Sequence, residues 1–145
     1  SAHAAGTGAK IYISLGGKSG YPDSQPFAAE FRILAVSNGC FSATGPMLAG
    51  ADMDLGPTAL LEIDNVRVVV GSKPVQTMDQ AMFSHLGIEP VEQNIIAIKS
   101  SVHFRNDFQH ICAAVLPVIS PGPVIVDLST VPFQDPRLKR LSSKS

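Results

Sequence analysis

The chain has 145 residues, of which 45% are hydrophobic and only 16% are charged, enough for one domain with a buried core and unlike an intrinsically disordered chain or a coiled coil. The formal net charge is -1, yet residues 1–136 carry 7 basic against 12 acidic residues, because Arg137, Lys139, Arg140 and Lys144 belong to the last nine positions. An acidic body with 6% aromatic residues argues against nucleic acid as a partner, and the shortage of charge indicates that another domain or subunit covers part of the surface.

The first half of the chain has the pattern of antiparallel β structure. Residues 10–15 form a β-rich run, and residues 27–36 alternate apolar and polar side chains with the period of a strand that has one wetter face. Asn38-Gly39 predicts a hairpin turn. Asp64-Asn65 predicts a second hairpin, between strands at residues 59–63 and 66–70.

The second half changes to helices and short strands. Apolar side chains at helical spacing predict a two-turn helix across residues 78–86. Thr77 or Asp79 is the expected N-cap, Gly87 the expected C-terminal end, and Pro90 the stop.

A buried strand is predicted at residues 95–98, followed by a helix that carries an apolar stripe from Phe104 to Val115 and ends before Pro117. A last strand is expected through Val118 or at residues 124–126. The predicted fold class is therefore α+β: a single domain with a mixed, largely antiparallel sheet and two main helices in its C-terminal half.

The polar turn between these last two elements has the most chemical potential. Lys99, Ser100, Ser101, His103 and Arg105 gather where a predicted strand passes into a helix, and such a junction suits a carboxylate or a phosphate. A second interpretation makes Ser101 an N-cap, Lys99 a solvated charge, and His103 with Arg105 the outer face of the helix. The local sequence leaves both interpretations open.

The same helix places His103, Asp107 and His110 at spacings of four and three residues. The rise from the first to the third is about 10 Å in a straight helix, so at most two of them bind one ion. The alternative is an ordinary polar stripe. His3 and His85 are expected in the tail and at a helix end, and neither makes a good ligand, so the residues point to no metal site in this chain.

Compartment and targeting follow from simpler features. Cys40 and Cys112 form no CxxC motif, which favours a reducing, cytoplasmic location. No run approaches the roughly 18 apolar residues of a membrane span, and the start lacks both a signal peptide and an initiator Met. We expect no membrane contact, and we expect the chain to be a piece of a longer protein.

The segment IAIKSSVHFRNDF, residues 96–108, resembles the signature KSSxHFR of the C-terminal domain of MlrC-like proteins, the microcystin-degradation metallopeptidase family. The resemblance covers about residues 10–128 and departs at FQDPRLKRLSSKS, which lacks an Arg-Pro-rich finish. Further matches occur in the same order: LGGK at residues 15–18, GPMLAG at 45–50, LGPTALLEIDNVRVVVGS at 55–72, Gln76 with Asp79 and Phe83, and LGIEP at 86–90.

The resemblance implies a zinc-dependent hydrolase whose larger N-terminal domain holds the metal ligands and is missing here. Residues 1–9 would then be a tail that continues from that domain, residues 10–134 the MlrC-like C-terminal domain, and residues 135–145 a basic tail. Zinc is expected in the full-length protein and none in this chain alone. The implied partners are the N-terminal catalytic domain and a peptide-like substrate, with a homo-oligomer as a further candidate.

The resemblance also favours a functional interpretation of the polar turn. The domain is expected to dock on the catalytic domain and to help close its substrate cleft, while being inactive in isolation. The alternative is a structural or oligomerisation module without substrate contact. The residues expected to line the cleft are Gln76, Lys99, Ser100, Ser101, His103 and Arg105.

Overall fold

The computed structural model of the chain describes residues 1–18, 20, 24–120, 131, 134 and 135. The chain forms two compact units, Ser1–Ile13 with Ala28–Leu116, and Ser14–Phe27 with Pro117–Ser145. The strand predicted at residues 124–126, the turn before it and nearly all of the basic tail lie outside the described residues. Val118, the other predicted start of that strand, lies in irregular chain.

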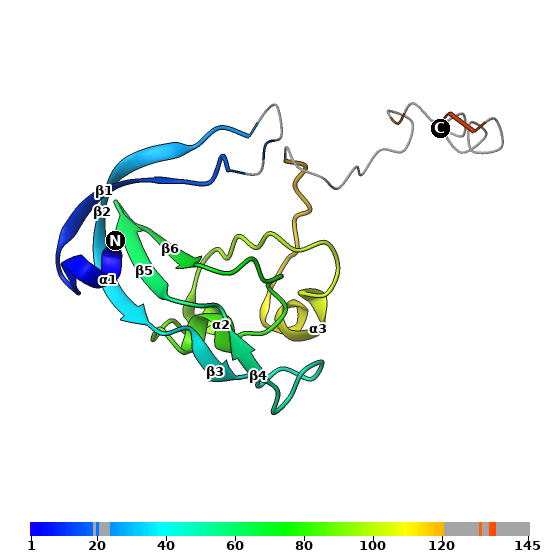
Figure 1. Cartoon of the computed structure of the whole chain (residues 1–145). Helices are drawn as coiled ribbons and strands as arrows, with labels where there is room; N and C mark the ends of the chain where they lie inside the picture. Colours follow the sequence, from blue (N-terminus) through cyan, green and yellow to red (C-terminus); the bar gives the residue numbers. More distant parts are fainter. Residues whose placement is uncertain (19, 21–23, 121–130, 132–133, 136–145) are drawn as a thin grey trace. The chain divides into compact units, whose positions relative to one another are not determined.

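A four-stranded sheet has the order β1-β2-β5-β6 (Figure 1). Strand β5 pairs antiparallel with β2 on one side and with β6 on the other. The predicted fold class, α+β with a largely antiparallel sheet, is confirmed. The strands are β1 (Lys10–Leu15), β2 (Phe27–Ser37), β5 (Thr58–Ile63) and β6 (Val66–Gly71).

The alternation predicted for β2 sorts its side chains between two environments. Phe31 and Ile33 are 1% and 0% exposed, whereas Arg32 between them reaches across to Glu62, its register partner on β5. Arg32 Nη2 lies 2.5 Å and Nε 3.1 Å from Glu62 Oε2. A pair on a partly exposed face adds at most about 1 kcal/mol, so the pair chiefly supports the register, and the buried face supplies the stability. The register then shifts by one residue between Ile33 and Ala35.

The predicted hairpin at Asp64-Asn65 is confirmed. Ile63 pairs with Val66, so two residues connect β5 to β6. Asp64 takes a positive φ of 51°, a conformation that Asp tolerates better than most residues because its short polar side chain bonds locally.

The hairpin predicted at Asn38-Gly39 is wrong. The chain does not reverse there: it continues into β3 (Cys40–Ser42), which pairs with β4 (Asp52–Asp54) in a separate two-stranded sheet. The Asn38 side chain accepts a hydrogen bond from the N–H of Cys40 at 3.0 Å, a local contact typical of Asn in turns that forms here without a chain reversal. The reversal comes later, in the loop between β3 and β4, where the N–H of Gly50 donates to the carbonyl of Ala43 at 2.9 Å.

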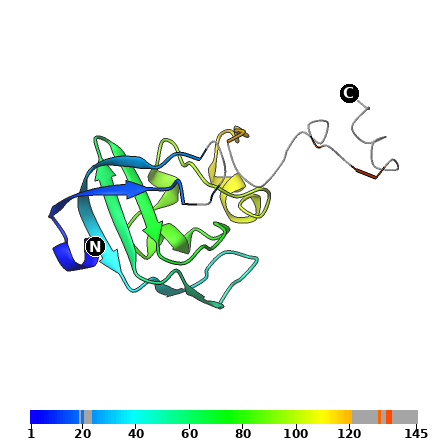
Figure 2. The ribbon, with the colours of Figure 1, turned by 45° about the horizontal axis from the view of Figure 1, so that its top comes forward.

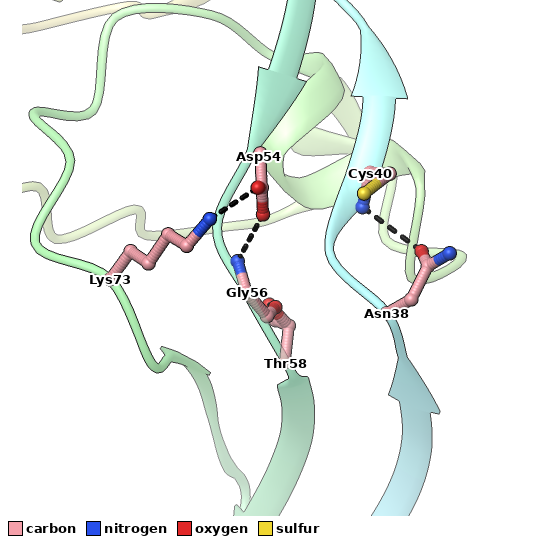
Figure 3. A network of polar contacts seen from close by, with 6 residues as sticks. All are labelled: Asn38, Cys40, Asp54, Gly56, Thr58 and Lys73. Carbon is pink, nitrogen blue, oxygen red and sulfur yellow. Dashed lines mark hydrogen bonds and ion pairs between the residues drawn. The ribbon is translucent and has the colours of Figure 1, made fainter.

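Polar contacts hold the junction between the two sheets (Figure 3). The Asp54 carboxylate accepts from the N–H of Gly56 at 2.7 Å and pairs with the Lys73 ammonium. The carbonyl of Gly56 accepts from the Thr58 hydroxyl, also at 2.7 Å. Gly39 lies so close that a Cβ there would fall 2.0 Å from the Gly56 carbonyl oxygen. The two strand pairs therefore meet at a junction that only glycine fits.

The Asp54 contacts make the junction sensitive to acid. The Lys73 ammonium and the Gly56 N–H hold the pKa of the Asp54 carboxyl below its ordinary value. A carboxyl whose folded pKa is depressed contributes stability above the unfolded pKa, about 3.9, and loses it as pH falls through the folded pKa. We expect Lys73→Ala to move the Asp54 titration, followed by NMR of its carboxyl carbon, to higher pH. Lys73→Arg, the charge-preserving control, should leave it low, and an equal rise in both variants would refute the assignment to charge.

The helices occupy the predicted regions but are short. The N-cap of α2 is Gln80, and Asp79, one of the two expected N-caps, accepts from the N–H of Ala81 and also from those of the distant Thr44 and Gly45. Gly87 ends the turn after α2 with a φ of 79°, as predicted, and Pro90 opens a 3-10 turn. No helix among the described residues is long and apolar enough to cross a bilayer. The elements are α1 (Ala2–Ala5), α2 (Ala81–Ser84), η1 (Pro90–Glu92), α3 (Arg105–Phe108) and η2 (Gln109–Ile111).

Two further predictions in this half are wrong. Residues 95–98 form no strand, and Ile95 is 88% exposed, because the run has no neighbouring strand to pair with in the described chain. The long helix expected up to residue 115 ends at Ile111, where Cys112 adopts an extended backbone. A short apolar run does not distinguish a buried strand from an exposed connection.

The segment that contains α2 covers part of the four-stranded sheet (Figure 2). Leu60 of β5 packs with Leu86 and Ile88, which follow α2, and all three are buried. Burying each such side chain contributes roughly 1.5–3 kcal/mol. This packing holds the segment that follows α2 against the sheet, and the connection that leads from β6 to α2 contains Gln76 and Asp79.

Candidate functional site

The structure brings together three of the six predicted cleft residues. Gln76, in the connection before α2, donates from Nε2 to Ser100 Oγ at 2.9 Å. Its other side-chain atom, Oε1, lies 3.1 Å from His103 Nδ1. Because one amide contacts both side chains, Gln76 sets the relative position of Ser100 and His103, which are otherwise carried by an irregular turn.

The other three predicted residues lie at the surface beside this bridge. Lys99, Ser101 and Arg105 are exposed. The Arg105 guanidinium carbon lies 5.2 Å from the centre of the Phe104 ring, and Nη1 donates to Gln109 at 3.5 Å. Stacking on an aromatic ring restrains the guanidinium while most of its five donors remain available. The turn therefore presents two cations and a histidine on the outside.

The capping interpretation of this turn is wrong in its central point. The first residue before α3 is Phe104, and no side chain caps the helix. Ser101 therefore does not act as the N-cap, and Ser100 is engaged by Gln76 instead. Neither serine hydroxyl of the KSSVHFR segment therefore caps the helix α3 that follows it.

Two buried carboxylates, those of Asp79 and Asp107, lie a few residues along the chain from Gln76 and Arg105. Sequence patterns did not predict their contacts. Asp79 is 1% exposed. Its Oδ2 accepts from the Gly45 N–H at 2.8 Å, and its Oδ1 accepts from the N–H groups of Ala81 at 2.9 Å and Thr44 at 3.3 Å. This one side chain ties the loop between β3 and β4 to the start of α2. The only sequence signal was its place in the resemblance, since capping alone explains an Asp at that position.

Asp107 is the second buried carboxylate, at 6% exposure. Its Oδ2 accepts from the Gln80 N–H at 2.6 Å, and its backbone carbonyl accepts from the Gln80 side chain at 2.6 Å. A Cβ on Gly45 would lie 2.7 Å from Asp107 Oδ2 and 3.0 Å from Asp79 Oδ2. The connection between residues 76 and 80 thus contacts the polar turn, the β3–β4 loop and α3.

These residues do not form a zinc site. No three His, Cys, Asp or Glu side chains converge among the residues that the structure describes. Asp107, one member of the possible ligand stripe, faces inward and accepts hydrogen bonds from Gln80, whereas His103 and His110 are exposed. The oxygens of Asp79 are likewise occupied by N–H donors. A zinc ion has no set of free ligands in the described chain.

The remaining histidines and the cysteines play other parts. His85 lies at the C-terminal end of α2, as expected, and is half-buried. Its ring stacks on Phe41 at 4.5 Å between ring centres, and its Nδ1 lies 2.9 Å from the Ala81 carbonyl. His3 Nε2 lies 3.1 Å from the Thr58 carbonyl. Cys40 and Cys112 are free thiols.

Comparison with known proteins places these features in a family. The model of the MlrC C-terminus matches residues 1–135, which include Gln76, both buried carboxylates and the whole polar turn. The chain belongs to the MlrC C-terminus family. Relative to microcystinase C of Sphingomonas sp, the MlrC-like chain is 27% identical over 116 residues, which are 80% of this chain and 22% of that protein.

A solved structure supports the fold of the MlrC-like chain. It is the crystal structure, at 2.13 Å resolution, of a proposed metallopeptidase from Mesorhizobium sp. BNC1. The two share 24% sequence identity with a TM-score of 0.68 over 76% of this chain and 22% of that chain. The chain therefore spans about a fifth of the length of both proteins.

Proposed function

We propose that this MlrC-like chain is the C-terminal accessory domain of a metal-dependent peptidase-like hydrolase and docks on a catalytic domain in the N-terminal part of the same polypeptide. Three comparisons support this: the chain matches a C-terminal family model, and it spans 22% of microcystinase C and 22% of a proposed metallopeptidase. The zinc ligands are assigned to the catalytic domain, because the described residues here offer no set of three. The two free thiols favour a reducing, cytoplasmic location.

One observation carries the proposed role: Gln76 arranges Ser100 and His103 at the surface, beside exposed Lys99 and Arg105. A bridge of this kind orders polar groups that do not serve the core. Val75 and Val102, each adjacent in sequence to a member of the bridge, are 36% and 58% exposed. An ordered polar centre with exposed apolar neighbours suits a surface that another domain or a substrate covers.

The side chains divide the work at such a surface. Arg105 offers a planar fork of donors for a carboxylate, and its stacking on Phe104 lowers the entropy that binding costs. Lys99 supplies a second positive charge for an anionic group of a peptide-like substrate. His103 and Ser100 supply hydrogen bonds in fixed positions, and the covering domain excludes water from them. Catalytic chemistry itself is assigned to the N-terminal domain.

The test uses the full-length protein that contains this domain. We expect His103→Ala and Arg105→Ala each to lower kcat/KM for peptide hydrolysis by roughly ten- to a hundredfold, since a hydrogen bond to a charged group contributes about 1.5–3 kcal/mol. His110→Ala and Arg67→Ala, which change exposed residues outside the bridge, are the matched controls and should change kcat/KM less than twofold. Unchanged hydrolysis in both test variants would contradict a cleft role.

A further inference from the structure

The bridge has a direction, because its central amide has one donor and one acceptor end. Gln76 Nε2 faces Ser100 Oγ, so the amide oxygen Oε1 faces His103 Nδ1. An amide oxygen only accepts hydrogen bonds, and therefore Nδ1 carries the proton and donates it. This holds for the neutral and for the charged imidazole.

We infer that Gln76 is a positioning residue that holds neutral His103 in its Nδ1–H form and thereby leaves the Nε2 lone pair as an outward-facing acceptor. In a neutral histidine, a hydrogen bond donated by one ring nitrogen fixes the proton there and leaves the other ring nitrogen as an acceptor. His103 is exposed, so Nε2 is accessible. At the opposite end, Ser100 Oγ accepts a hydrogen bond from Gln76 Nε2, so the Ser100 hydroxyl is left to donate its own hydrogen to an outside acceptor.

An outward acceptor and an outward donor, both ordered by the same amide, are the two kinds of group that hydrogen-bond a peptide backbone. In an extended strand, the N–H and the C=O of one residue point to the same side, which lets paired strands exchange two hydrogen bonds. We assign the N–H of a bound peptide to His103 Nε2 and its C=O to the Ser100 hydroxyl. This assignment rests on the proposed role at the substrate cleft and specifies which substrate groups the bridge reads.

The direction of the bridge is tested on this chain by NMR. With ¹⁵N-labelled histidine at about pH 8.5, where neutral imidazole dominates, we expect His103 to show a protonated Nδ1 and an unprotonated Nε2. Gln76→Leu should shift His103 towards a mixture of the two forms. Gln76→Glu, whose carboxylate also accepts from Nδ1–H, should preserve the Nδ1–H form even though the contact with Ser100 changes. A wild-type His103 protonated at Nε2 would overturn the inference, as would a Gln76→Leu spectrum identical to the wild type.

The peptide assignment is tested by titrating end-blocked tetra-alanine into the full-length protein, labelled with ¹⁵N-histidine and treated with a chelator so that the peptide is not cleaved. We expect a saturable shift of His103 Nε2 that the N-methylated peptide, which lacks the donors, does not produce. An equal shift with both peptides, or none up to the solubility limit, would reject the assignment. Because neither measurement depends on turnover, a failure here is distinguishable from a failure of the hydrolysis test.

Discussion

Replacing Gly39 by Ala is expected to destabilise the domain far more than replacing Gly50 by Ala. Both glycines have positive φ values, 78° and 79°, so the backbone cost, about 1–2 kcal/mol, is the same for both. A Cβ at Gly39 would lie 2.0 Å from the Gly56 carbonyl oxygen and 2.8 Å from Thr58 Oγ1, whereas a Cβ at Gly50 meets nothing within 4 Å. The difference between the two variants isolates the steric cost at the sheet junction.

We expect the Gly39→Ala cost to reach about 2–5 kcal/mol, because overpacking adds roughly 1–3 kcal/mol to the backbone term. That is a large part of the 5–15 kcal/mol that typically stabilises a domain. Urea unfolding of both variants measures the difference at constant m-value. An equal loss of unfolding free energy in the two variants would show that the junction accommodates a Cβ at Gly39 by a small shift of the backbone, which would contradict the steric argument.

The same junction shows where the sequence was informative and where it was not. The alternation in β2 and the Asp64-Asn65 turn predicted the sheet correctly, because side chains buried on one face leave a pattern of period two. Asn38-Gly39 has an equally strong turn signal, but whether the chain reverses or continues depends on a partner 16 residues away: the Gly39 carbonyl accepts from Leu55 N–H at 2.9 Å. A local pattern does not contain that information.

The candidate site was also predictable only in part, because local sequence identifies polar residues but not their distant partners. The resemblance singled out Gln76 and the KSSVHFR segment, and the structure joins Gln76 to Ser100 and His103 over 24 and 27 residues. The short helices and the irregular course of residues 95–98 were missed, because apolar spacing alone does not reveal that tertiary hydrogen bonds replace helical ones. The distant contacts of Asp79 are the clearest example, since one carboxylate supports a loop 34 residues away.

The second large effect is expected at that carboxylate. Asp79→Ala removes the acceptor for the N–H groups of Thr44, Gly45 and Ala81. A buried donor left without a partner costs about 1–3 kcal/mol, and the truncation also leaves a cavity, so we expect a loss of about 3–5 kcal/mol. Asp79→Asn keeps one acceptor but turns an amide donor towards a backbone donor, and an intermediate loss is expected. Asp52→Ala, at an exposed position on β4, is the control and should cost under about 0.5 kcal/mol.

Hydrogen exchange of single amides separates this mechanism from general destabilisation. The Gly45 N–H is held by Asp79 Oδ2 at 2.8 Å in a buried contact, so in Asp79→Ala its exchange should accelerate more than that of the Leu61 amide in the core strand β5. Local opening of the β3–β4 loop has that signature, because exchange then follows a free energy below that of global unfolding. The polar turn should respond as well, since residues 76–80 carry both Gln76 and Asp79: the His103 resonances are expected to broaden in Asp79→Ala and to stay sharp in Asp52→Ala. Uniform acceleration of all amides with unchanged His103 resonances would mean that the loop and the turn are not linked through this connection.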